Sequence, residues 1–523
     1  MKISIRNVFL FAVLLIIGAV CGYSFMYENK WDFTNYHYYN AWAFLNGRVG
    51  YDIAPASVNT YNNPLIEIPF YYMVKYLNDY PGVVSALQGM YFGILVFMVF
   101  KIAELFFSQG YRYKNLLTVL STLIGVTGFA TFMQVSTTSN EIQTAILVLW
   151  AFYILLKVFS GGKGETLPTF FSSGLLLGMA AGLKLTAVIY CASIFLTLLI
   201  FRKKLNRPGM LIFMFCLGGT VGFLLINGFW MWKLWTLLGN PVFPFANTIF
   251  KSEYFDNFNY SDRRFLPKNL TEYIFYPFIW AFHFERRVVA ETYFIDFRFA
   301  AVYLILLYYA VRRFVCKFKE SDGIRFLFVY IVCSYAIWLL FFSILRYAIP
   351  IEVFSGVIIV KFAYDTFPVA LWKRAITISV WILLFFILIS MAAYSVPWGT
   401  RRGDAKVIDV EKIEVTEDDV ILLYNMPSAA IVSTLIPGKS KVRVMGTKQG
   451  NVIVMGGTDF TERKKFRLLR DEVLKNRKGR IIAIVRKWYN SLYNVDETKD
   501  PYLKDLQCRP LLNNLDDHLN ICM

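Results

Sequence analysis

The sequence has few charged residues: only 17% of its 523 residues are Asp, Glu, Lys or Arg. Soluble domains carry roughly 25% charged residues, so the composition argues against an ordinary soluble enzyme. Cysteine and histidine are also scarce, with 7 and 3 residues, which argues against a disulfide-rich scaffold and against a zinc cluster. The sequence has no Walker lysine loop, GxSxG elbow or GxGxxG motif, so we expect neither nucleotide hydrolysis nor a soluble nucleotide-sugar donor.

Hydrophobic residues make up 57% of the chain and aromatic residues 18%. A transmembrane helix needs about 20 predominantly apolar residues, and apolar runs of roughly this kind recur along the first 400 residues. They predict eleven spans, at 6–26, 83–107, 115–134, 141–159, 170–183, 186–201, 209–236, 298–315, 324–344, 348–364 and 373–394. The first run lacks a small-residue cleavage site, so we expect a retained helix. The predicted fold class is a polytopic α-helical membrane protein.

The distribution of charge and the lengths of two apolar runs predict the orientation in the membrane and the positions of two hairpin turns between spans. A single helix over 170–201 would place the basic segment 202–207 outside, so we predict a hairpin that turns near Lys184. The run 324–364 is about twice a bilayer's length, and a second hairpin turning at 346–350 accounts for it. Lys and Arg then concentrate in the inner segments, while the outer loops contain more acids than bases. The net charge of +18 therefore indicates cytoplasmic loops and no nucleic-acid partner, and it predicts an N-terminus on the cytoplasmic side.

An odd number of spans places residues 395–523 outside. Strands are predicted at 419–423, 442–445 and 481–485, and a helix at 461–475, which together indicate a small exported α/β domain. The predicted domains are a transmembrane module, 1–394, with outer loops 27–82 and 237–297, and the exported domain 395–523. An oxidising compartment allows a disulfide between Cys508 and Cys522, and the sequence leaves open whether it forms.

The first outer loop carries the most prominent candidate, Asp32, directly after the first span. A carboxylate at the membrane surface can accept a proton from an attacking hydroxyl. The alternative is that Asp32 caps a helix predicted at 33–46, because Asp is a favoured N-cap. This helix and a second one at 64–77 are rich in Tyr and Trp. Such rings suit a membrane interface and can also stack on sugars.

Three further charged residues are predicted to face outside. Glu141 opens the fourth span, and an acid at a helix N-terminus is favourable in itself. Lys184 and Arg346 lie at the two outer hairpin turns, where the positive-inside rule does not account for a cation. They suit an anionic headgroup, and Arg binds phosphate bidentately; snorkelling to the interface is the alternative for both.

These features resemble the GT-C superfamily of integral-membrane glycosyltransferases. The resemblance rests on Trp31-Asp32, the interfacial helices, Glu141, the segment Gly174-x3-Gly178-x3-Gly182-Leu183-Lys184 and the turn Arg346-Tyr347-x2-Pro350. Two further phrases, Trp31-Asp32-x2-Asn35-Tyr36-His37-Tyr38-Tyr39 and Gly239-Asn240-Pro241-x-Phe243-Pro244, are similar to a bacterial branch whose members mostly lack assigned substrates.

The resemblance implies that a polyprenyl-phosphate-linked sugar is transferred to a glycan, lipid or protein acceptor on the outer face of a bacterial cytoplasmic membrane. It implies a cell-surface reaction with inversion. It implies Asp32 and Glu141 as catalytic residues and Lys184 and Arg346 as ligands of the donor phosphate. The implied substrate-binding residues are Trp31, Asn35, Tyr36, His37, Tyr61 and Arg298.

The residue after Asp32 is Phe33, so the adjacent acidic pair of the superfamily is missing and we assign neither metal nor cofactor. The alternatives are an O-antigen or capsule polymerase or a ligase, which generally lack an exported C-terminal domain. A lipid or sugar transporter is a further alternative, and it would be expected to show repeated halves and broken polar helices at mid-membrane.

Overall fold

The structure is a computed structural model. It describes residues 4–28, 30–107, 111, 113–161, 164–258, 260–283, 288–366, 400–401, 405–425, 428–448, 460–487 and 500–523. The chain divides into two compact units. The first, here called the helical unit, comprises Met1–Tyr27, Ser85–Ile226 and Phe265–Trp398. The second, the mixed unit, comprises Glu28–Val84, Asn227–Arg264 and Gly399–Met523.

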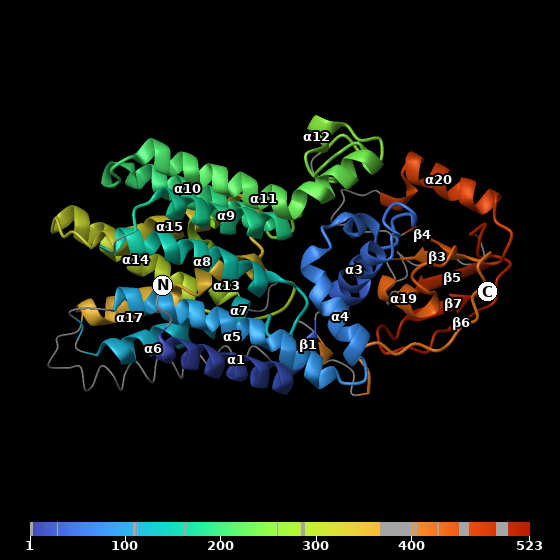
Figure 1. Ribbon diagram of the computed structural model, residues 1–523, viewed down its shortest axis with the longest axis horizontal. Coiled ribbons are helices and arrows are strands. Elements are labelled where there is room, and N and C mark those ends of the chain that lie inside the picture. The colour runs from blue at the N-terminus through green and yellow to red at the C-terminus, as the bar shows by residue number, and fades with distance from the viewer. Residues whose placement is uncertain are drawn as a thin grey trace. The chain divides into compact units, whose positions relative to one another are not determined.

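The helical unit is a bundle of long helices (Figure 1). Helices α5 and α11 contribute residues to both units. The bounds are α1 Ile5–Phe25, α5 Pro81–Phe106, α6 Lys114–Val126, α7 Phe129–Phe132, α8 Glu141–Phe159, α9 Leu167–Leu183, η4 Leu185–Ala187, α10 Val188–Phe201, η5 Arg202–Lys204, α11 Pro208–Leu238, α13 Leu270–Phe282, α14 Arg298–Val315, α15 Asp322–Phe341, η6 Leu345–Ala348, α16 Ile349–Glu352 and α17 Ser355–Thr366.

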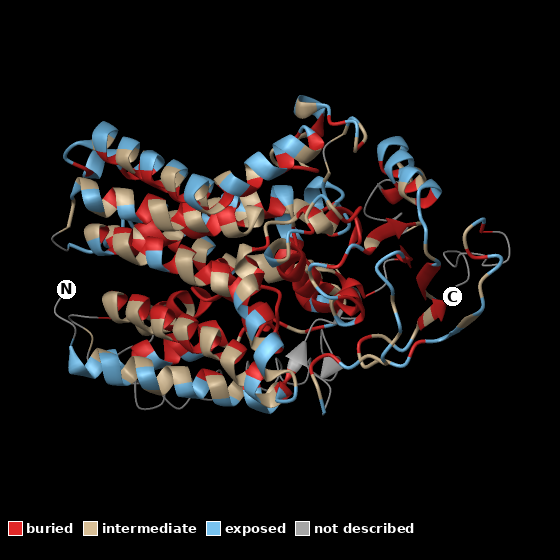
Figure 2. Ribbon diagram, turned by 45° about the vertical axis from the view of Figure 1, so that its right-hand side comes forward, coloured by how far each residue is buried: buried red, intermediate tan, exposed pale blue. Residues whose placement is uncertain are grey.

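Within the described residues, 6 helices are long and apolar enough to cross a membrane, or 7 if the bent pair 345–352 and 355–366 is one span. They are α1, α5, α8, the continuous run 185–204, α11 and α15. Exposed apolar side chains line their outer faces, and Figure 2 shows the buried residues gathered inside the bundle. The chain is therefore a membrane protein, as the composition predicted.

The predicted count of eleven spans is not confirmed. Helix α6 has 13 residues and α9 has 17, and both are short for a span. The predicted span 115–134 breaks between α6 and α7, and α14 contains three arginines, Arg298, Arg312 and Arg313. The predicted span 373–394 lies outside the described residues. The two predicted hairpin turns are present, since Lys184 separates α9 from η4 and α10, and η6 separates α15 from α16.

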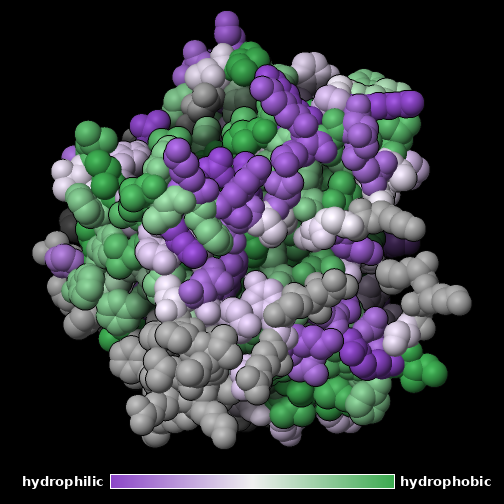
Figure 3. All heavy atoms as spheres, turned by 90° about the vertical axis from the view of Figure 1, so that its left-hand side faces the viewer, coloured by the Kyte–Doolittle hydropathy of each residue, from purple (hydrophilic) through white to green (hydrophobic). Residues whose placement is uncertain are grey.

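One end of the helical unit carries many hydrophilic side chains. Figure 3 views the molecule from this side and shows many hydrophilic side chains among apolar ones. The connection between α10 and α11 lies at this end (Figure 1), and its cations Arg202, Lys203 and Lys204 are exposed. This is the end that the sequence predicts to face the cytoplasm.

The mixed unit contains a five-stranded sheet of order β4-β3-β5-β7-β6. Strand β3 is parallel to both β4 and β5, whereas β7 is antiparallel to β5 and β6. The bounds in this unit and at its edge are β1 Tyr27–Glu28, α2 Lys30–Asp32, η1 Phe33–His37, α3 Tyr38–Leu45, η2 Ser57–Tyr61, η3 Leu65–Glu67, α4 Ile68–Leu77, α12 Asn247–Phe250, β2 Thr400–Arg401, β3 Val420–Tyr424, η8 Ala429–Ile431, α19 Val432–Leu435, β4 Arg443–Thr447, η9 Phe460–Glu462, α20 Lys464–Lys475, β5 Ile481–Arg486, β6 Cys508–Pro510 and β7 Leu519–Cys522.

The small α/β domain predicted at the C-terminus is therefore present. Strands β3 and β5 are apolar runs buried on both faces of the sheet, which is the pattern expected of central parallel strands. Cys508 and Cys522 are cross-strand partners and form a disulfide. The bond joins the last two strands and answers the question that the sequence left open.

The first loop belongs to the same compact unit as this sheet. Phe33, Tyr38 and Tyr71 share a hydrophobic core with one face of the sheet, and the other face packs against Tyr61 and Trp230. Ile53 pairs with Met445, since its N–H donates to Val444 O at 2.9 Å and its carbonyl accepts from Gly446 N at 2.8 Å. The loop thereby covers part of the β4 edge, which would otherwise expose unpaired backbone groups.

Candidate active site

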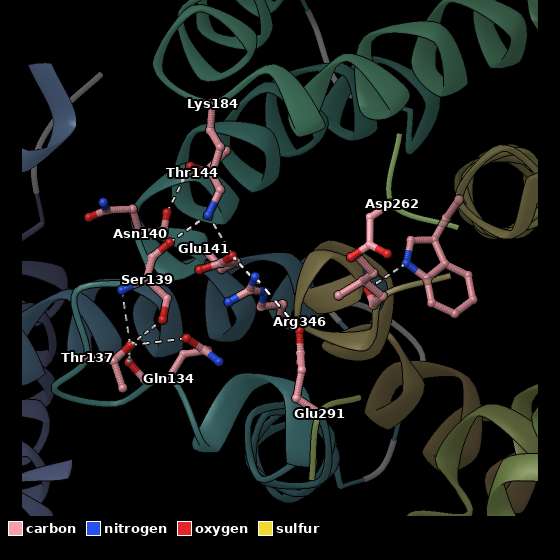
Figure 4. Close-up of polar contacts among 12 residues, drawn as sticks. Gln134, Thr137, Ser139, Asn140, Glu141, Thr144, Lys184, Asp262, Glu291 and Arg346 are labelled. Carbon is pink, nitrogen blue, oxygen red and sulfur yellow. Dashed lines mark hydrogen bonds and ion pairs between the residues drawn. The ribbon is translucent and has the colours of Figure 1, made fainter. Parts of the chain in front are cut away.

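Three of the predicted site residues meet in the helical unit. Glu141, Lys184 and Arg346 line a small, partly open pocket, together with residues that include Tyr190 and Tyr347. Figure 4 shows the three charged side chains pointing toward one another from three different segments. Glu141 and Lys184 are 43 residues apart in the sequence, and Arg346 lies far beyond both, so the bundle assembles this cluster by tertiary packing.

Lys184 is placed by the end of α9. Gly174 and Gly178 lie against α11: an added Cβ at either residue would approach a backbone oxygen, of Phe215 or Gly219, to 2.0 Å. The glycines of the quoted motif therefore let two apolar helices pack closely, as small residues do in membranes. After α9 the backbone of Lys184 becomes extended, and its Nζ donates to Ser139 O at 2.6 Å and to Glu141 Oε1 at 2.6 Å.

Glu141 stands between the two cations. It is the first residue of α8 and follows Asn140, whose φ is 67°. Its Oε1 accepts from Lys184 and lies 3.7 Å from Arg346 Nε, while the side chain is only 4% exposed. The carboxylate therefore occupies the helix N-terminus, where an acid is favoured, and is at the same time the counter-ion of Lys184.

Arg346 lies in η6 with its side chain 14% exposed. Its Nη2 is 4.0 Å from Glu291 Oε1. The ring of Tyr347 is 5.4 Å from the Arg346 guanidinium carbon and 5.6 Å from Lys184 Nζ, within the range of cation–π contacts. Tyr190 fixes this turn by donating from its hydroxyl to Tyr347 O. Sequence reasoning identified the Arg346 turn but assigned no role to Tyr190, Tyr347 or Glu291.

Asp32 lies in the mixed unit and is 3% exposed. It ends α2 and passes directly into the π-helix η1, with helical φ and ψ of −64° and −46°, and its side chain makes no capping hydrogen bond. The alternative reading of Asp32 as an N-cap therefore does not describe its geometry, because an N-cap has extended backbone angles. Single π-helical turns are frequent at functional sites.

The residues after Asp32 form a buried polar segment. Asn35 is 1% exposed, and His37 Nδ1 pairs with Glu67 Oε1 at 2.7 Å with both side chains buried. The Tyr36 ring contacts those of Trp31 and His37, with centroid distances of 6.2 and 4.2 Å. Glu67 was not singled out from the sequence, since nothing in its spacing indicates His37 as a partner.

Tyr61 and Arg298, predicted to bind substrate, have the contacts of structural residues. Tyr61 packs in the core of the mixed unit, and burial raises the pKa of its hydroxyl. Arg298 is 0% exposed; its NH1 donates to Asp296 Oδ2 at 2.7 Å and its Nε to Ile124 O at 2.9 Å. Their roles as substrate ligands stay predictions, and these contacts lend them no support.

Another buried acid of the first loop, Asp52, holds the loop to the sheet. Arg48 donates to both of its oxygens at 2.7 Å, Tyr39 donates at 2.7 Å, and Val444 N donates at 3.1 Å. Burial raises the pKa of Asp52 despite the opposing effect of Arg48. Within the described residues, no group of three or more His, Cys, Asp or Glu side chains is placed to hold a metal ion.

No family model and no curated protein sequence matches this chain. The chain is similar to two solved structures of ArnT from Cupriavidus metallidurans, one bound to undecaprenyl phosphate and one in the apo state. Each match has a TM-score of 0.54 and 10% sequence identity, and covers 99% of this chain and 97% of ArnT. ArnT is a GT-C glycosyltransferase. The likeness shows that the chain has the GT-C fold, as its motifs predicted.

Proposed function

We propose that this protein is a membrane glycosyltransferase that moves a sugar from a polyprenyl-phosphate-linked donor to an acceptor hydroxyl on the outer face of the membrane. The observation that carries the proposal is the pair of cations, Lys184 and Arg346, which line one pocket in a chain with the GT-C fold. A fold alone does not specify an activity, so the proposal rests on this pocket. The binding of undecaprenyl phosphate by ArnT supports the choice of lipid.

The chemistry explains why two cations are needed. The acceptor oxygen forms a bond to the anomeric carbon while the bond from that carbon to the phosphate oxygen breaks. The departing phosphate goes from one negative charge to two, so groups that bind the extra charge stabilise the transition state more than the ground state. Lys184 supplies a point charge, and Arg346 supplies a planar fork that matches phosphate oxygens. Tyr347 holds both side chains by its ring.

Asp32 is our candidate for the general base that takes the acceptor's proton. Its burial and its place at the start of a π-helical turn support this role. A single displacement of this kind inverts the anomeric centre. Asn35, Tyr36, His37 and Trp31 lie in the same segment and are our candidates for substrate contacts.

We propose that Glu141 acts as an internal counter-ion of Lys184 and not as a second general base. Lys184 is held by Ser139 O as well as by Glu141 Oε1, at 2.6 Å each. Its position therefore does not depend on Glu141 alone, whereas the negative charge of Glu141 opposes an incoming phosphate. Glu141 then limits how tightly the phosphate product is held and so favours its release.

We further propose that the protein lies in a bacterial cytoplasmic membrane with its N-terminus inside. The C-terminal sheet domain is then exported, and the Cys508–Cys522 disulfide supports this, because such bonds persist in oxidising compartments. A domain on that side of the membrane would suit recognition of a glycan, lipid or protein acceptor.

Mass spectrometry of the lipids that co-purify with the protein tests the donor class. We expect a polyprenyl-phosphate sugar in extracts of the wild-type protein and its depletion from Lys184→Ala and Arg346→Ala. Arg325→Ala is the matched control, because this partly exposed arginine pairs with Asp322, away from the pocket residues. Equal lipid content in all four proteins would contradict the proposal.

A further inference from the structure

A buried carboxylate outside the pocket holds together two chain segments that carry pocket residues. Glu352 ends α16 and is 1% exposed. Its Oε1 accepts from Ala130 N at 3.0 Å, and its Oε2 accepts from Thr131 N at 2.7 Å and from Thr131 Oγ1 at 2.6 Å. The donors lie in the first turn of α7. Amides at a helix N-terminus lack intrahelical partners, and a carboxylate satisfies them.

Two further buried charges hold the break between α6 and α7. Asp296 Oδ2 accepts from Phe129 N at 3.1 Å. On the other side of the break, Arg298 donates to Ile124 O at 2.9 Å and to Thr127 O at 3.1 Å. Anions thus bind the N-terminus of α7, and a cation binds the last carbonyls of α6, in accord with the two helix dipoles.

Small residues allow this close approach. A Cβ at Gly128 would lie 2.1 Å from the carboxyl carbon of Glu352, and one at Gly125 would lie 2.2 Å from Val353 O. On the facing helix, a Cβ at Gly356 would lie 1.9 Å from Ser121 O. The carboxylate therefore fits only because position 128 has no side chain.

The chain connects this contact to the residues on both sides of the pocket. Arg346 precedes Glu352 by six residues, within the continuous helical segment formed by η6 and α16. Ser139 and Glu141 follow α7 through a buried segment, in which Thr137 Oγ1 donates to Gln134 Oε1 at 3.1 Å (Figure 4). Both segments are thus joined at Glu352, one by the chain and one by hydrogen bonds.

We infer that Glu352 is a positioning residue for the phosphate site. Through α7 it fixes Ser139 and Glu141, which hold Lys184, and through α16 it fixes Arg346. Its hydrogen bonds go to Ala130 and Thr131, and through them it sets the separation of the two cations. The inference rests on the proposed function, because that function makes a polyprenyl phosphate the ligand of the pocket.

The test is the affinity of purified full-length variants for undecaprenyl phosphate in detergent. Glu352→Gln removes the charge with little change in shape, and Gly128→Ala pushes the carboxylate aside while keeping its charge. We expect each to weaken binding roughly two- to thirtyfold, the range of effects transmitted through packed networks. Thr131→Val removes one hydrogen bond and serves as a milder variant, for which we expect a smaller loss in the same direction.

Asp365→Asn is the matched control. Asp365 is a part-buried carboxylate on α17 that binds Lys361 Nζ at 2.6 Å and Tyr309 OH at 2.7 Å. Its loss should lower the melting temperature without weakening lipid binding. The double variant Gly128→Ala/Glu352→Gln should bind no more weakly than the worse single variant, because both changes act on one contact and are not additive. The donor KM should rise in the Glu352 variants while the acceptor KM stays at the wild-type value.

Two different results would overturn the inference. In the first, Lys184→Ala and Arg346→Ala lose lipid affinity, whereas Glu352→Gln, Gly128→Ala and Thr131→Val bind lipid like wild type and only melt at a lower temperature. Glu352 is then purely structural, and the proposed function stands. If Lys184→Ala and Arg346→Ala also bind like wild type, the pocket is not the phosphate site, and the proposed function and the inference fall together.

Discussion

Asp32 and Asp52 are two buried acids of the same unit with different surroundings. Asp52 is held by both arms of the Arg48 guanidinium, by Tyr39 and by the Val444 amide. It joins the first loop to β4 and has a complete structural role. Asp32 lies within a helical run, at the entrance to the π-helix η1 and among the candidate substrate contacts. The same substitution at the two positions should therefore have different consequences.

Asp32→Asn should lower the rate of transfer by about 10²- to 10⁴-fold, the usual cost of losing a general base. The amide keeps the size of the carboxylate but accepts no proton, so donor affinity and protein yield should stay near wild type. Transfer assays with saturating donor measure the rate, and lipid titration measures the affinity.

Asp52→Asn is the matched control for this prediction. It breaks a buried ion pair and leaves Arg48 without its charged partner, which typically costs about 3–5 kcal/mol of stability. We expect a lower melting temperature here and unchanged stability in Asp32→Asn. Turnover above half of wild type in Asp32→Asn would remove Asp32 from the catalytic role.

Glu141→Gln distinguishes a counter-ion from a base. Removing the negative charge beside Lys184 should tighten binding of undecaprenyl phosphate by about tenfold, equivalent to about 1.4 kcal/mol, while Ser139 O still holds the lysine. Turnover should fall only to the extent that product release becomes slower. A large loss of single-turnover rate with unchanged lipid affinity would instead make Glu141 a base.

At the scale of elements, α9 depends on its glycines to present Lys184. Gly178→Ala would place a Cβ 2.0 Å from Gly219 O and 2.7 Å from Phe223 N, both backbone atoms. The two helices must then separate, which we expect to cost about 1–3 kcal/mol of stability and to weaken lipid binding by displacing the end of α9.

The control is Gly209→Ala on α11, where an added Cβ meets nothing within 4 Å. Thermal melting and lipid titration on both variants measure the difference. A Gly178→Ala protein that melts and binds like Gly209→Ala would show that the close packing of α9 on α11 does not position Lys184.

The sequence predicted elements well where their pattern is local. Strands β3 and β5 were found because strands buried on both faces are continuous apolar runs. The predicted span 115–134 failed because its break depends on distant partners. Arg298, Asp296 and Glu352 bind the freed backbone groups between α6 and α7, and these residues lie more than 150 positions further along the chain.

The candidate site was predictable in part for the same reason. Lys184 and Arg346 are cations at turns predicted to face outside, where the charge rule does not account for them, and the structure brings them to one pocket. Tyr190 and Tyr347 have no such signal, since aromatic residues are common throughout this chain. The packing of the first loop on the C-terminal sheet was also missed, because the pairing of Ile53 with Met445 joins segments almost 400 residues apart.

For the whole molecule, the proposed orientation predicts that the C-terminal domain is exported. In a protein whose five free cysteines are replaced by serine, a cysteine at Asn476 should react with a thiol reagent that cannot cross the membrane. Asn476 directly follows α20 and is exposed. A cysteine at Lys204, which is also exposed, should react only after the membrane is permeabilised. The reverse pattern would invert the topology and the site assignment.

The central claim is that Lys184 and Arg346 bind the phosphate of a polyprenyl-phosphate donor, and lipid titration tests it most directly. Each charge-assisted contact to phosphate contributes about 1.5–3 kcal/mol, so Lys184→Ala and Arg346→Ala should each weaken undecaprenyl phosphate binding roughly ten- to a hundredfold. Arg346→Lys should also be impaired, because it loses the bidentate geometry. Wild-type affinity in both alanine variants, with Arg325→Ala as the reference, would contradict the account.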